Sequence, residues 1–150
     1  MTTSENITRA EAQERAAIIS AESYRVELDL RGQGPTFRSV TTVDFTCSTP
    51  GSSTWIDLIA PEVLSVELNG SALDVASVVS GARITLPELK AQNQVVVTAN
   101  AAYMNTGEGL HRFIDPVDNE TYLYPQFESA VARRRYACFE QPDLKGTFQL

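Results

Sequence analysis

Gln126 and Glu128 are the two residues whose types and spacing most suggest a binding site. They lie in the stretch YPQFESAVARRRYACFEQP, residues 124–142. Residues i and i+2 of a β-strand point to the same face, so an amide oxygen and a carboxylate can meet on one ligand while Phe127 anchors the other side. Taken alone, the same pattern also fits the polar face of an edge strand.

The single histidine, His111, limits the catalytic chemistry that this sequence can support. A zinc site of the type H-E-x-x-H needs two histidines on one helix, so that site is excluded. A hydrolase with a serine or cysteine nucleophile would depend entirely on His111 as its base. This rival hypothesis requires a nucleophile within hydrogen-bond reach of the imidazole.

Composition limits the class of protein further. A length of 150 residues suits one domain, and a net charge of −7 disfavours nucleic acid as a partner. No stretch approaches the roughly 18 apolar residues of a membrane span, and the N-terminus has no apolar signal region. We therefore expect a cytoplasmic protein with no nucleic-acid or membrane partner, in which Cys47 and Cys138 are free thiols.

The elements that must position Gln126 and Glu128 are mostly β-strands. Thr8 and Glu11 have the spacing of a capping box, which predicts a short helix over residues 9–19. From Tyr24 the apolar residues alternate with polar ones, as in a half-buried strand, and Asn69-Gly70 predicts a hairpin. Further strands are expected over residues 37–47, 54–59, 82–87, 93–104, 110–115 and 120–127.

This pattern predicts a mainly β fold, an antiparallel β-sandwich or a curved saddle-like sheet with a short N-terminal helix. Pro125 favours an edge or a bulge near the end of its strand. Residues 129–139 read as a short helix, and residues 146–150 read as the start of a strand with no terminator. We therefore expect residues 1–150 to be one domain of a longer polypeptide.

Four short motifs in order and register resemble the N-terminal domain of the aminopeptidase N family, zinc metallopeptidases of the gluzincin type. They are Gly-Leu-x-Arg at 109–112, Gln-Phe-Glu at 126–128, Ala-Arg-Arg at 132–134 and Cys-Phe-x-x-Pro at 138–142. The resemblance implies an enzyme that removes N-terminal residues from peptides. It also implies that this β-domain packs against a catalytic domain that holds the zinc, and that this chain itself binds no cofactor.

The resemblance implies that Gln126 and Glu128 hold the α-amine of the peptide substrate. The chemistry of these residues agrees, because an ammonium group offers several donors to a carboxylate and an amide oxygen. The sequence departs from the family where Glu140-Gln141 replace an acidic pair and where His111 replaces a tyrosine. We expect salt bridges from residues 133–135, and self-association of the separated domain through the surface that normally packs on its neighbour.

A second rival hypothesis is a stand-alone β-sandwich module that binds a partner and has no catalytic role. A longer reading frame that encodes H-E-x-x-H would distinguish the aminopeptidase from this module.

Overall fold

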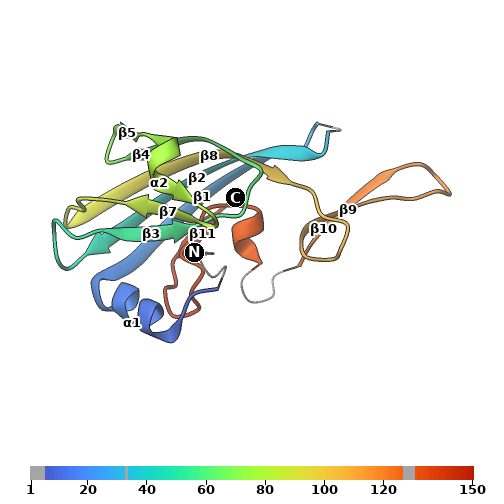
Figure 1. Cartoon of the computed structure of the whole chain (residues 1–150). Coiled ribbons are helices and arrows are strands. Elements are labelled where there is room, and N and C mark those ends of the chain that lie inside the picture. Colours follow the sequence, from blue (N-terminus) through green and yellow to red (C-terminus); the bar gives the residue numbers. More distant parts are fainter. Residues whose placement is uncertain (1–5, 33, 127–130) are drawn as a thin grey trace.

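The structure, a computed structural model, describes residues 6–32, 34–126 and 131–150. A large curved sheet and a small sheet share one core, and a two-stranded hairpin projects from the body (Figure 1). The fold is mainly β with open sheets and a short N-terminal helix, which confirms the fold class expected from the sequence.

The large sheet has six strands, and its neighbours are antiparallel except for the parallel pair at one edge. In spatial order the strands are β11 (Thr147–Gln149), β1 (Ile19–Asp29), β2 (Thr36–Cys47), β8 (Gln92–Ala102), β4 (Glu62–Leu68) and β5 (Ser71–Leu73). Along β2 every second residue is buried, because one face of the sheet packs on the core. Asn69 and Gly70 both have positive φ in the turn between β4 and β5, which confirms the predicted hairpin.

The small sheet closes the other side of the core. Its strands, in spatial order, are β3 (Thr54–Asp57), β7 (Arg83–Leu86) and β6 (Val79–Ser80), and the one-turn helix α2 (Val75–Val78) leads into β6. The sequence analysis predicted no helix at the position of α2. Ile56, Ile84 and Leu86 from this sheet lie in the same buried cluster as Val43 and Phe45 of β2.

The hairpin of β9 (Gly109–Ile114) and β10 (Thr121–Gln126) forms a separate sheet. Its base is attached through a small second cluster, in which Leu110 packs with Phe37 and Ala101. Pro125 lies in this two-stranded sheet, so the prediction of an edge position is confirmed. After it, the described chain resumes with the 3-10 helix η1 (Ala132–Arg134), which is shorter than the helix predicted over residues 129–139.

The N-terminal helix α1 (Arg9–Ile18) has the predicted capping box between Thr8 and Glu11. Glu11 also forms an ion pair with Arg83 of β7, with 2.7 Å between Oε1 and Nη1. The hydrogen bond from Arg83, and after it the hydrogen bond from the Thr8 backbone, lower the pKa of Glu11 to about 2. The helix runs directly into β1, since its C-cap residue Ile19 is the first residue of that strand.

Arg15 anchors α1 in the core, although the helix reads as a plain alanine-rich surface helix. Its side chain has no exposed surface, and its Nη1 lies 2.8 Å from Asp57 Oδ2. Its Nε donates to Gln141 Oε1 at 3.1 Å, and its Nη1 donates to the backbone carbonyl of Trp55. The guanidinium also lies 4.7 Å from the centre of the Trp55 ring. One side chain thus joins the first helix, β3 and the segment 138–142.

We predict that Arg15→Ala destabilises the domain by about 3–5 kcal/mol, because it leaves the buried Asp57 carboxylate without its cation. Urea unfolding of the two proteins measures this difference. Arg9→Ala, at an exposed position of the same helix, is the control and should change stability by less than about 0.5 kcal/mol. A loss at Arg15 no larger than the loss at Arg9 would contradict the proposed anchor.

Candidate functional site

The end of strand β10 is where the structure places the first of the two predicted ligand-binding residues. Gln126 is the last residue of β10, and its backbone pairs with Gly109 at the start of β9. Glu128 lies outside the described residues. Whether both side chains converge on one ligand therefore stays a prediction.

The backbone on both sides of residues 127–130 meets at Gly109. On the near side, Gly109 is the strand partner of Gln126. On the far side, a Cβ atom added to Gly109 would lie 3.2 Å from the Cβ of Arg134 in η1. Gly109 has a φ of 66°, which a side chain would strain, so this close approach requires glycine. The Gly-Leu-x-Arg and Ala-Arg-Arg motifs are thus brought together in space.

We call this region the Gly109 junction, defined by Met104, Gly107, Gly109, His111 and Arg134. Arg134 Nε lies 3.6 Å from a carboxylate oxygen of Glu108, which confirms the expected salt bridge for this arginine. Arg133 and Arg135 are both buried in the same segment. The junction connects three parts of the chain: the loop 105–108, the hairpin and η1.

The imidazole of His111 has two described contacts. Its Nδ1 accepts a hydrogen bond from the backbone N–H of Gly107 at 3.0 Å, and its ring stacks on Tyr124 with the centroids 4.5 Å apart. Neither partner is an activated nucleophile. Within the described ranges no serine or cysteine bonds to this ring, so the structure gives no support to the rival hydrolase based on His111.

Both cysteines are free and buried, as predicted. The Cys138 thiol lies 3.5 Å from Glu140 Oε2, and burial raises its pKa well above the ordinary value. The thiol is therefore protonated at neutral pH and is a packing group rather than a nucleophile.

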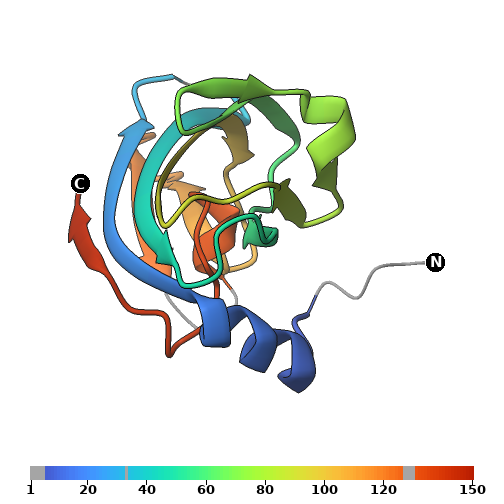
Figure 2. The same cartoon turned by 90° about the vertical axis from the view of Figure 1, so that its left-hand side faces the viewer.

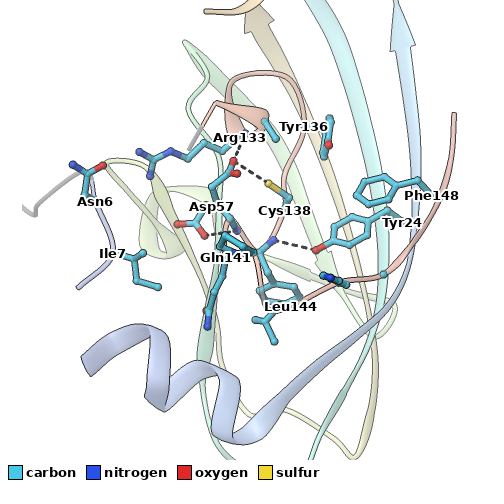
Figure 3. Close-up of a pocket in the computed structure, with 16 residues that line it drawn as sticks. Asn6, Ile7, Tyr24, Asp57, Arg133, Tyr136, Cys138, Gln141, Leu144 and Phe148 are labelled. Atoms are coloured by element: carbon cyan, nitrogen blue, oxygen red, sulfur yellow. Dashed lines mark hydrogen bonds between the residues drawn. The ribbon is translucent and has the colours of Figure 1, made fainter. Parts of the chain in front are cut away.

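A cavity of about 570 Å³ opens beside the segment 138–142 (Figure 3). Several of its polar groups have partners within the domain. The Tyr24 hydroxyl accepts from the Phe139 N–H, Glu140 accepts from the Arg133 N–H, and Asp57 pairs with Arg15. The Cys-Phe-x-x-Pro motif therefore has a structural role here.

The described residues contain neither a cluster of metal ligands nor a membrane-spanning helix. Among residues 6–32, 34–126 and 131–150, no group of three or more His, Cys, Asp and Glu side chains could hold a metal ion. The described part of the chain therefore does not fit a zinc ion. No helix in the same ranges is long and apolar enough to cross a membrane.

The sequence is 55% identical to aminopeptidase N of Streptomyces lividans over 147 residues. These residues are 96% of this chain but 17% of that protein, so the chain spans about a sixth of its relative. No model of a protein family matches the sequence.

Solved structures with the same fold include two peptidases and a hydrolase. Yeast LTA4 hydrolase has a TM-score of 0.72 at 15% identity, and the match covers 89% of this chain and 22% of that protein. Legionella pneumophila aminopeptidase A, in complex with aspartic acid, has a TM-score of 0.71 at 14% identity, and the match covers 87% of this chain and 15% of that protein. The M1 zinc metallopeptidase of Deinococcus radiodurans has a TM-score of 0.63 at 18% identity, and the match covers 87% of this chain and 31% of that protein. At these identities the likeness concerns the fold. The 55% identity goes further: this chain is a homologue of one segment of aminopeptidase N.

Proposed function

We propose that this chain is the N-terminal β-domain of a cytoplasmic zinc aminopeptidase that removes N-terminal residues from peptides. The observation that carries the proposal is the 55% identity to aminopeptidase N over almost the whole chain. The shared fold of the zinc metallopeptidase of Deinococcus radiodurans is consistent with it. The metal would be held by another part of the longer protein, where zinc activates water for peptide hydrolysis.

In this proposal Gln126 and Glu128 hold the α-ammonium group of the substrate. An ammonium group has three N–H donors, and a carboxylate with an amide oxygen supplies matching acceptors and one negative charge. The anchoring of Gln126 and Arg134 at Gly109 supports this role, since a binding segment needs fixed ends. Recognition of a charged terminus would restrict the enzyme to the first peptide bond.

The partner of this domain would be the catalytic domain of the same protein, and the hairpin offers a surface for it. Large apolar side chains are exposed on the hairpin and its turn: Phe113, Ile114, Val117, Tyr122 and Tyr124. Phe113 and Tyr122 are directly opposite each other across the two strands. A projecting hairpin with such an apolar surface is typical of a docking element.

The function is tested by comparing this chain with the longer polypeptide that contains it. The longer protein should hydrolyse aminoacyl-arylamides and lose this activity on dialysis against a zinc chelator. The isolated chain should show background hydrolysis with or without added zinc. Zinc-dependent turnover by the isolated chain would overturn the proposed division of labour, and a longer protein with no turnover would favour the stand-alone binding module.

The role of Glu128 is tested in the longer protein. Glu128→Ala should lower kcat/KM by about thirtyfold, which corresponds to about 2 kcal/mol for a lost charge-assisted hydrogen bond. Glu27→Ala, at an exposed position of β1, is the control. If the two variants have the same kcat/KM, Glu128 does not contact the substrate.

The docking surface is tested in the isolated chain. We predict that this chain self-associates at micromolar concentrations in sedimentation experiments, because the surface of the hairpin lacks its neighbour. The double variant Phe113→Ser/Tyr122→Ser should be monomeric, whereas Thr42→Ser on β2 should behave like the parent. Equal association of all three proteins would place the contact elsewhere.

A further inference from the structure

The turn between β4 and β5 contains Asn69-Gly70, the single Asn-Gly pair of the sequence. In such a pair the backbone nitrogen of the glycine can attack the side-chain carbonyl carbon of the asparagine, because no Cβ atom of the glycine shields that nitrogen. The product is a cyclic imide, which water opens to aspartate or isoaspartate. Water reaches this turn, since Asn69 is half-buried and Gly70 is exposed.

The closed turn keeps the two reacting atoms apart. The φ angles of Asn69 and Gly70 are 53° and 81°, and a two-residue hairpin turn with both φ angles positive is of type I′. In this type of turn the first central residue has a ψ of about +30°. At that angle its Cβ and the nitrogen of the next residue lie on nearly opposite sides of the Cα–C bond. The Asn69 Cγ therefore cannot reach the Gly70 nitrogen until the turn opens.

The carboxamide of Asn69 holds the turn closed by bonding to β8. Its Oδ1 accepts from the Gln94 N–H at 2.9 Å, and its Nδ2 donates to Asn93 Oδ1 at 3.0 Å. The Asn69 N–H also donates to the Gln94 carbonyl at 2.8 Å. The side chain and the backbone of one residue thus extend the pairing of β4 with β8 into the turn.

Asn93 is a fixed partner for this carboxamide. Its side chain is buried, its Nδ2 donates to the Lys90 carbonyl at 2.7 Å, and its Oδ1 also accepts from the Lys90 N–H at 2.8 Å. Rotation of the Asn93 amide would break both bonds to Lys90, so its oxygen stays directed at the turn. This oxygen accepts a donor from position 69 and would be repelled by an acceptor there.

Neither product of deamidation fits this site. An ionised aspartate has no donor, so one of its oxygens would face Asn93 Oδ1 across the 3.0 Å that the hydrogen bond now spans. An isoaspartate carries the main chain through its Cβ and adds one methylene group to a turn that pairs Leu68 with Ser71. Once formed, either product prevents the turn from closing as before.

We propose that Asn69 is a deamidation site at which opening of the β4–β5 turn becomes irreversible. In the opened turn the Gly70 nitrogen bonds to the Asn69 Cγ, the Cγ–Nδ2 bond breaks, and ammonia leaves with the proton of the Gly70 N–H. Water then adds to one of the two imide carbonyls and breaks the bond of that carbon to nitrogen, which gives aspartate or isoaspartate. The reaction needs only water, and it is independent of the proposed function.

The reaction is followed in this chain by peptide mapping that separates asparagine, aspartate and isoaspartate at position 69. The chain is incubated at mildly alkaline pH, either folded or in concentrated urea. We expect Asn69 to react before the other asparagines in urea. In the folded chain it should react at least about thirtyfold more slowly, because only the opened fraction reacts. Equal rates in the two conditions overturn the proposal, as does earlier reaction of another asparagine in urea.

Two variants test whether the turn, rather than global unfolding, controls the reaction. Asn93→Ala removes the partner of Asn69 Nδ2 and should raise the rate in the folded chain by about tenfold. Ile84→Val, in the buried part of the small sheet, lowers global stability without touching the turn and should leave the rate within about twofold of the parent. An equal effect of the two variants would overturn the assignment to the turn. The comparison of the folded and the unfolded parent depends on neither variant.

The effect of the product on the fold is measured with Asn69→Asp. We expect its midpoint of thermal unfolding to lie about 5 °C below that of the parent, because the carboxylate gives Asn93 Oδ1 no donor. Asn105→Asp makes the same change of charge at an exposed position and should shift the midpoint by less than about 2 °C. Equal midpoints for the two variants would show that the product still closes the turn, which overturns the proposal.

Discussion

The buried contact between Arg15 and Asp57 is the interaction on which the arrangement of this domain depends. Removing two charges from water is costly, and further hydrogen bonds to the two groups offset part of that cost. Here Asp57 also accepts from the Glu140 N–H, and Arg15 also donates to Gln141 and to the Trp55 carbonyl, while the buried Nη2 of Arg15 has no hydrogen-bond partner among the described residues. The pair therefore holds together three parts of the chain that no continuous strand connects.

Much of the fold could be predicted from the sequence because the signals are local. The capping box, the Asn69-Gly70 turn and the alternation that starts at Tyr24 each depend on a few adjacent residues, and each is found in the structure. The role of Arg15 could not be predicted in this way. Its partner Asp57 is 42 positions away, and nothing in an alanine-rich helix indicates that its arginine points inward.

The candidate site shows the same contrast between local signals, which the sequence contains, and distant contacts, which only the structure shows. The motifs identified Gln126 and Glu128, and the spacing of a strand gave a reason for their pairing, but neither showed what supports them. Gly109 and Arg134 are 25 positions apart in the sequence, and only the folded chain brings them so close that a Cβ atom added to Gly109 would lie 3.2 Å from the Arg134 Cβ. His111 reads as an ordinary exposed or packed histidine until its bond to Gly107 is seen. In the sequence, the signal for this bond would have been a single histidine shortly after a loop that contains glycine.

The network around Arg15 also has a consequence for the order of events during synthesis. Arg15 and Gln141 are separated by 126 positions, so the set of hydrogen bonds of Arg15 is complete only after residue 141 has left the ribosome. Before that point Arg15 can pair with Asp57, which is 42 positions away, but its Nε lacks its partner Gln141. The contacts that hold α1 in this domain are therefore completed late in the synthesis of the segment 9–141.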